Sequence, residues 1–192
     1  MKKLRIYIDF KSVDSYFAFH QTEKITAKYS VDIEWWPFLI KTRQPLIKKN
    51  SETRGETHHR IRENHKRQMQ VKYAHILGLP LYFRSEEHST DLALSMLLGP
   101  RNNVNEYIKL SYDYFWRQKK DLNNPVVVEN LLTVSNSPGQ LLINKKNLTN
   151  SLLEATDEAK NRGIIGVPAY EIEDAIFIGR EHLPWIRGML ST

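Results

Sequence analysis

The sequence predicts an α/β protein in which a block of helices separates two strand-containing ends of the chain. The chain opens with a strand, a helix and a second strand, which together favour a parallel pair joined by a right-handed crossover. The middle of the chain shows helical spacing of apolar residues and no strand pattern. Two short β-rich segments and a final helix then follow. The expected order is therefore β-α-β, several helices, and α-β-β-α.

The N-terminal end is expected to form a strand over Leu4–Phe10, a helix over Ser15–Tyr29 and a strand over Val31–Ile40. Both strands are short runs of bulky and β-branched residues bounded by polar ones. In the helix, aromatic and apolar residues recur at helical spacing. Pro37 indicates that the second strand ends, bulges or lies at a sheet edge there.

The middle and C-terminal elements are set off by glycine and proline. A polar, basic loop is expected over Lys41–Arg54, and Gly163 is expected to cap the last long helix of the middle block. The turn Glu173-Asp174 predicts an antiparallel hairpin. The expected helices are Gly55–Leu77, Ser89–Leu98, Val104–Lys119, one beginning at Pro125, a short one at Ser137–Gly139, Asn147–Arg162 and Glu181–Leu190; the expected hairpin strands are Val167–Ile172 and Ala175–Ile178.

Composition narrows the possible functions. The 192 residues are 41% hydrophobic, enough for one substantial core or for a domain with a large insertion. No apolar run reaches the roughly 18 residues that suggest a membrane span, and the start lacks a signal-peptide pattern, so we expect a cytoplasmic protein without membrane contact. The chain has no cysteine, which excludes disulfides, cysteine-ligated metals and a protein thiol nucleophile. The net charge of +6 suits an anionic ligand.

One basic helix in the middle of the chain raises two other possible functions, metal binding and nucleic-acid binding. His58, His59 and His65 lie on one predicted helix, but its carboxylates are few and its Lys and Arg residues many, so we expect no metal site. The same basic helix could indicate nucleic-acid binding. Interspersed glutamates and the lack of a recognised motif favour a solvated helix face, so we expect no nucleic-acid partner.

The predicted order of elements is that of the thioredoxin fold. In that fold a cis proline precedes the third strand, opposite the N-terminus of the first helix. Gly166-Val167-Pro168-Ala169 lies at this point. A cis bond there would turn the backbone of Val167 outward, so that it could pair with a peptide-like ligand. The alternative is an ordinary proline at a strand start.

Several short stretches, each weak alone, occur in a consistent order along nearly the whole chain. They are Asp9-Phe10-Lys11-Ser12, Trp35-Trp36-Pro37-Phe38, Tyr114-Phe115-Trp116 with Asp121, Thr156-Asp157-Glu158-Ala159, Gly163 to Pro168, and Phe177 to Leu183. By this ordered set the chain resembles the DsbA-like family, within it the branch of 2-hydroxychromene-2-carboxylate isomerase and kappa-class glutathione transferase. The resemblance implies a thioredoxin fold interrupted by a large all-helical insertion domain, with the thioredoxin-like domain at 1–45 and 150–192 and the insertion at 46–149.

The resemblance also implies that glutathione supplies the reactive sulfur. Ser12 would hold its thiolate at the first helix N-terminus, where free N–H groups favour an anion. Lys11 is a further cofactor-binding candidate, and Val167 and Pro168 would pair with the cysteinyl unit. The alternative for Ser12 is a simple helix cap, a role open also to Ser15.

Three residues after the last strand complete the implied cofactor site. Glu181 falls where the family has an acidic residue and would bind the γ-glutamyl ammonium; the alternative is a glutamate favoured by the helix dipole. Arg180 and His182 depart from the family pattern but remain cofactor-binding candidates. Val13-Asp14 departs further, because relatives often have proline and an aromatic residue there. A negative Asp14 near a thiolate would raise its pKa, unless Lys11 offsets it or Asp14 caps the helix and points away.

The substrate candidates are aromatic and basic. Tyr114 and Trp116 would form a wall for a flat aromatic substrate, or else pack between helices. Trp36 and Lys41 are further substrate-binding candidates, with core packing and solvation as their alternatives. The expected activity is cis/trans isomerisation of an aromatic-derived acid by transient thiolate addition. The alternatives are a kappa-like transferase and a non-catalytic binding protein. By resemblance we expect a homodimer.

Overall fold

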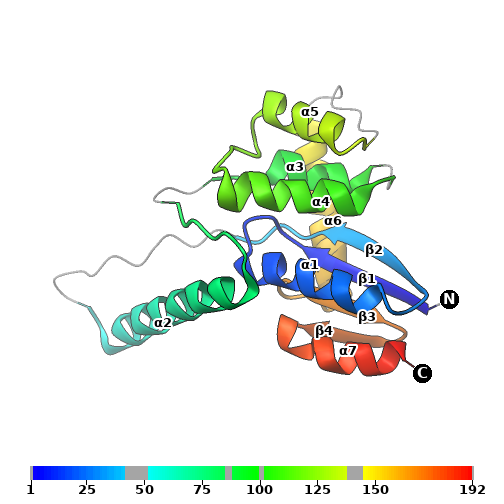
Figure 1. Ribbon diagram of the computed structural model, residues 1–192. Helices are drawn as coiled ribbons and strands as arrows, with labels where there is room; N and C mark the ends of the chain where they lie inside the picture. The colour runs from blue at the N-terminus through cyan, green and yellow to red at the C-terminus, as the bar shows by residue number, and fades with distance from the viewer. Residues whose placement is uncertain (1, 42–51, 85–87, 100–101, 138–144, 192) are drawn as a thin grey trace.

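The computed structural model describes residues 2–41, 52–84, 88–99, 102–137 and 145–191 (Figure 1). One sheet has the strand order β2-β1-β3-β4. β1 and β2 are parallel and are connected by the helix α1, while β3 is antiparallel to both β1 and β4. This confirms the predicted thioredoxin fold. The bounds are β1 Lys2–Ile8, α1 Val13–Thr26, β2 Val31–Pro37, β3 Ala169–Ile172 and β4 Ala175–Ile178.

Between β2 and β3 the described residues form helices and no strand, as the predicted all-helical insertion requires. The predicted helix 104–119 is divided, because its second half is a π-helix, η2. Residues 138 and 139 of the short helix expected near Ser137 lie outside the described residues. The predicted boundary at 149 and 150 falls inside α6. The bounds are α2 Arg54–Leu77, α3 Asp91–Ser95, η1 Met96–Leu98, α4 Val104–Tyr112, η2 Asp113–Arg117, α5 Pro125–Val134 and α6 Lys145–Asn161, then η3 Arg180–His182 and α7 Leu183–Leu190 after β4.

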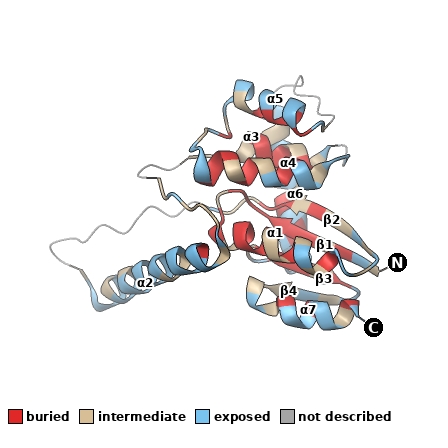
Figure 2. Cartoon of the chain, in the orientation of Figure 1, coloured by how far each residue is buried: buried red, intermediate tan, exposed pale blue. Residues whose placement is uncertain are grey.

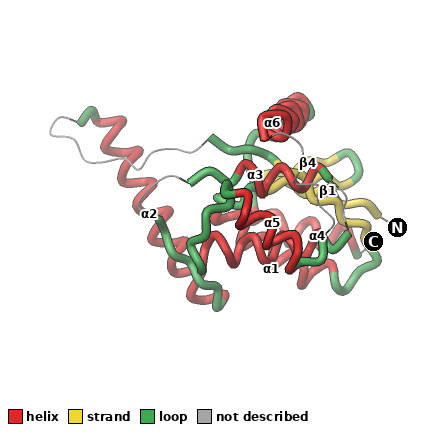
Figure 3. The backbone as a smooth tube through the Cα atoms, turned by 90° about the horizontal axis from the view of Figure 1, so that it is seen from above, coloured by secondary structure: helices red, strands yellow, loops and turns green. Residues whose placement is uncertain are grey.

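The sheet lies between helices on its two faces. α1 and α7 cover one face, and α6 lies across the other (Figures 1 and 3). Alternate side chains of β1 explain this, since they point to opposite faces. Leu4, Ile6 and Ile8 are buried in the large core with α1, whereas Tyr7 is buried in a smaller cluster with Ala159 of α6.

Aromatic side chains hold the insertion against the sheet domain. Tyr112 of α4 packs edge-on against Phe10, at 5.3 Å between ring centroids, and its ring is tilted against that of Tyr16 of α1, at 5.2 Å. All three rings are buried. Burial of aromatic rings contributes strongly to the free energy of folding, so these contacts with α4 hold the first turn of α1 in place.

The helix α2 projects away from the rest of the molecule (Figure 1), and most of its surface is exposed (Figure 2). Of its 24 residues only Ala74, near the C-terminal end, is buried. A capping box of Thr53 and Glu56 begins the helix, and Gly78 ends it in the left-handed conformation, with φ 66°. Because Ala74 is buried and α2 contacts α1, the C-terminal half of α2 packs against the rest of the molecule and can contribute side chains to a site there.

Candidate functional site

The first turn of α1 has unused backbone donors. Ser12 is the N-cap, and its buried Oγ accepts a hydrogen bond from the N–H of Ser15 at 3.1 Å. This settles the N-cap among the candidates. Within the described part of the chain, the N–H groups of Val13 and Asp14 have no acceptor, and the Ser12 hydroxyl donates to none. Such donors at a helix N-terminus favour an anion.

A buried carboxylate fixes the turn before α1. Asp9 accepts hydrogen bonds from the N–H of Lys11 at 3.1 Å, from the N–H of Ile40 at 2.9 Å and from the hydroxyl of Thr90 at 2.9 Å. Burial raises the pKa of Asp9, although these bonds and the Lys11 charge oppose the shift. The Lys11 ammonium lies 3.6 Å from Asp9 and 3.9 Å from Asp91. Lys11 therefore pairs with both carboxylates. It is not among the residues that line the pocket described below.

The Val167–Pro168 peptide bond is cis, as predicted. The carbonyl of Pro168 accepts a hydrogen bond from Gly179 N–H at 2.8 Å, which ties this loop to the end of β4. Across the residues that the structure describes, neither the N–H nor the C=O of Val167 has a hydrogen-bond partner. Unpaired backbone groups beside a cavity can pair with a peptide-like ligand.

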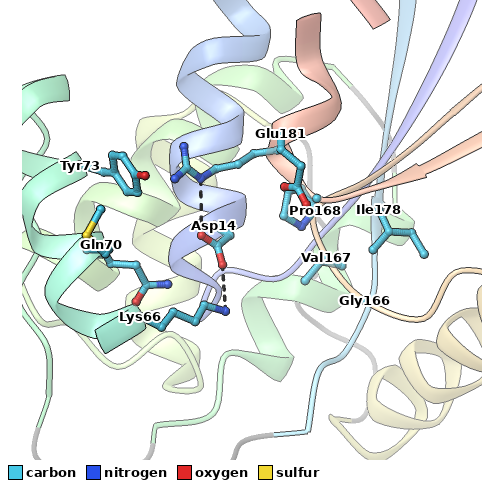
Figure 4. A pocket seen from close by; sticks show the side chains of 12 residues that line it. Asp14, Lys66, Gln70, Tyr73, Gly166, Val167, Pro168, Ile178 and Glu181 are labelled. Carbon is cyan, nitrogen blue, oxygen red and sulfur yellow. Dashed lines mark ion pairs between the residues drawn. The ribbon is translucent and has the colours of Figure 1, made fainter. Parts of the chain in front are cut away.

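A pocket of about 460 Å³ lies beside this loop (Figure 4). Its size is within the range of small-molecule sites. Four parts of the chain meet there: the first turn of α1, the cis-proline loop, the segment from β4 into η3, and α2. The lining residues are Asp14, Lys66, Met69, Gln70, Tyr73, Gly166, Val167, Pro168, Ile178, Gly179, Arg180 and Glu181. The predicted cofactor residues Val167, Pro168, Arg180 and Glu181 are thus brought together. The predicted catalytic residue Ser12 is buried and does not itself line the pocket, but it lies two residues before the lining residue Asp14.

Asp14 points into this pocket and pairs with two cations from different elements (Figure 4). Its carboxylate lies 3.1 Å from Lys66 Nζ of α2 and 3.6 Å from Arg180 Nε of η3. The Arg180 guanidinium carbon also lies 4.4 Å from the ring centroid of Tyr73 and 5.5 Å from that of Phe17. Arg180 is therefore held by an ion pair and two aromatic rings.

The two neighbours of Arg180 differ in position. Glu181 lines the pocket, and its carboxylate folds over Gly179, where an added Cβ would collide with it. Gly179 also has φ 109°, a conformation that L side chains rarely adopt. His182 does not line the pocket; its ring lies 5.7 Å from that of Phe177, between centroids. His182 therefore packs against β4 instead of facing the ligand space.

The predicted substrate residues do not line the pocket. Tyr114 and Trp116 are buried in the main core, which favours the packing alternative. Trp36 is half-buried beside Arg5 and donates from its indole N–H to Glu34. Lys41 is exposed.

The wall that sequence reasoning missed comes from α2. Lys66, Met69, Gln70 and Tyr73 all line the pocket, and their spacing of three and four residues places them on one helix face. The sequence showed that spacing, but it did not show which element this face would meet. An exposed, charged helix is more often a solvated face.

Neither a metal-binding cluster nor a membrane-spanning helix is found in the part of the chain that the structure describes. No group of three or more His, Asp or Glu side chains is placed to hold a metal ion. None of the helices in the described ranges is long and apolar enough to cross a membrane.

The strand order, the cis proline before β3 and the helical insertion define a thioredoxin-like α/β protein with a cysteine-free first turn. Residues 3–191 match the DSBA-like thioredoxin domain family, and the chain belongs to that family.

Two solved structures illustrate the likeness. A 2-hydroxychromene-2-carboxylate isomerase is 18% identical, with a TM-score of 0.72, over 98% of this chain and 94% of that one. A probable DsbA oxidoreductase from Streptomyces coelicolor is 17% identical, with a TM-score of 0.74, over 100% of this chain and 89% of that one. Curated protein sequences yield no match. At these identities the two structures show a shared fold.

Proposed function

We propose that the protein is a glutathione-dependent isomerase that acts on an aromatic-derived acid. One observation carries the proposal: in a chain without cysteine, Val167, whose backbone groups are unpaired, and Asp14, in the first turn of α1, line one pocket. Such an arrangement suits a peptide ligand that brings its own sulfur. A disulfide exchange reaction at this turn would need cysteines, and this chain has none.

The pocket residues and Ser12 have separate roles in binding glutathione and in stabilising its thiolate. Val167 pairs with the backbone of the cysteinyl unit, and Glu181 receives the γ-glutamyl ammonium. The Ser12 hydroxyl donates a hydrogen bond to the glutathione thiolate, and the positive end of α1 lowers the thiol pKa. Arg180 and His182 serve to shape the site, since the first is paired with Asp14 and the second packs on Phe177.

The reaction is a reversible addition. The thiolate forms a C–S bond to one carbon of an electron-poor C=C bond, and the electron pair of that bond moves onto the substrate. The remaining single bond rotates. The electron pair then returns, the C–S bond breaks and glutathione thiolate is released, so that no atom is gained or lost. The cytoplasmic location and the homodimer belong to the same proposal.

The proposal is tested by titration calorimetry with glutathione and with S-methylglutathione. We expect wild-type protein to bind glutathione in the micromolar to millimolar range. The thiol pKa of bound glutathione should fall below its free value in wild-type protein and should not fall in Ser12→Ala. S-methylglutathione has no thiolate, so both proteins should bind it alike. Absence of glutathione binding at millimolar concentration would overturn the proposal.

A second candidate is a non-catalytic binding protein. The observation that favours it is the Asp14 carboxylate in the pocket, because a negative charge there raises the pKa of a nearby thiol. Glutathione binding without a lowered thiol pKa, and without turnover of any electrophile, would support this candidate.

A further inference from the structure

We infer that the α2 face at the pocket binds the electrophilic substrate and that Tyr73 sets the preference for a flat aromatic ring. The inference rests on the proposed function, and it gives a role to a wall that comes from the helical insertion. It replaces Tyr114 and Trp116, which are buried elsewhere, as the aromatic part of the site.

The first step is the division of the pocket. Val167 and Glu181 lie on the side of the cis-proline loop and η3, where a peptide ligand would pair (Figure 4). Gln70 and Tyr73 lie on the opposite side, on α2 (Figure 4). Met69, another lining residue, belongs to the same helix. A thiolate held at the first turn of α1 would lie between the two sides. The α2 side is therefore the space left for the molecule that the thiolate attacks.

The charged residues that line the pocket balance one another. The pocket contains two carboxylates, Asp14 and Glu181, and two cations, Lys66 and Arg180. Their formal charges cancel, and Asp14 lies within 4 Å of both cations. Charge alone therefore gives little preference among anionic substrates. Selection then depends on the shape and the polarity of the wall.

The α2 side of the pocket has a fixed aromatic ring and a flexible apolar side chain. Tyr73 is fixed because Arg180 lies over its ring at 4.4 Å, and the neighbouring residue Ala74 is buried and anchors α2. Met69, one helical turn earlier, adds a polarisable thioether, which contacts aromatic rings favourably. Because Arg180 covers one face of the Tyr73 ring, a planar substrate ring would contact its edge or its other face, an aromatic contact that a puckered ring cannot reproduce.

The experiment uses glutathione-saturated protein and two probes of equal charge, naphthoate and its saturated analogue decalin carboxylate. We expect wild-type protein to bind naphthoate more tightly. Tyr73→Ala should weaken naphthoate binding by about two- to tenfold, the size of one aromatic contact, and leave the saturated probe unchanged. Tyr73→Phe should keep the preference. Tyr82→Ala, on an exposed tyrosine outside the pocket, is the matched control and should behave as wild type.

The outcomes separate this inference from the proposed function. If glutathione binds and the naphthoate preference survives in Tyr73→Ala, the α2 wall is not the substrate side and only this inference fails. If Tyr73→Ala weakens glutathione and naphthoate equally, Tyr73 belongs to the glutathione side and the inference is again overturned. If wild-type protein does not bind glutathione, the proposed function fails and the inference fails with it.

Discussion

Replacement of Ser12 by alanine should change both the stability of α1 and the acidity of bound glutathione, by amounts that can be separated. The Ser12 Oγ accepts the N–H of Ser15 at 3.1 Å and is buried, so its loss removes an N-cap. That costs about 1 kcal/mol. For a chain of this size the melting temperature should fall by about 2–4 °C. Calorimetric unfolding without ligand measures this part.

The second effect concerns only the thiolate. A hydrogen bond to a charged group contributes about 1.5–3 kcal/mol, and each pKa unit corresponds to about 1.4 kcal/mol. The thiol pKa of bound glutathione should therefore be about one to two units higher in Ser12→Ala, as measured by ultraviolet titration of the thiolate. Asn124→Ala, which removes the N-cap of α5, should lower stability alike and leave the thiol pKa unchanged. An equal thiol pKa in Ser12→Ala and wild type would refute the role of Ser12.

Asp14→Asn should lower the thiol pKa of bound glutathione by up to about one unit, because a negative charge leaves the pocket; a rise in the same titration would contradict this. Trp116→Ala should cost about 3–5 kcal/mol in denaturant unfolding, since this side chain is 5% exposed, while Trp185→Ala, at 72% exposed, should stay within about 0.5 kcal/mol. Burial alone would raise the pKa of Glu34, but hydrogen bonds and ion pairs with neighbouring cations lower it to about 2. Its stabilising effect is present above pH 4.5 and is lost as the pH falls towards 2, so Glu34→Gln should flatten the acid-unfolding curve in that window.

Much of the fold could be predicted because local signals agree with it. The strand Ala175–Ile178 was predicted with its observed bounds, and the start of α4 at Val104 likewise. Other observed ends differ from the predicted ones by a few residues, because tertiary contacts decide where a helix stops. The predicted helix 104–119 illustrates this: α4 ends at Tyr112, and the next five residues widen into a π-helix that contains Tyr114 and Trp116. No local sequence pattern indicated this switch from α-helix to π-helix.

The site was less predictable, since it depends on which elements meet. Val167, Pro168 and Glu181 were candidates because of the family resemblance, and the structure shows that they line one pocket. Tyr73 was not a candidate, because its place in the pocket depends on the approach of α2 to α1. Aromatic composition did not show which surface a residue faces: Tyr114 and Trp116 were candidates for a substrate wall, with helix packing as the alternative, and both side chains lie in the core.

The same contacts explain how a thiolate site could tolerate Asp14, the main departure from the family pattern. An unpaired carboxylate in the first turn of α1 would oppose a thiolate, but Lys66 and Arg180 both lie within 4 Å of Asp14. Lys66 and Arg180 offset the negative charge of Asp14, so this carboxylate opposes a thiolate at the helix N-terminus less than an unpaired one would. Lys66 belongs to α2, the helix whose basic residues suggested only a solvated face. In the proposed function the helical insertion thus supplies a positive charge beside the thioredoxin-like turn, and Lys66→Met should raise the thiol pKa of bound glutathione in the same ultraviolet titration while the fold stays intact.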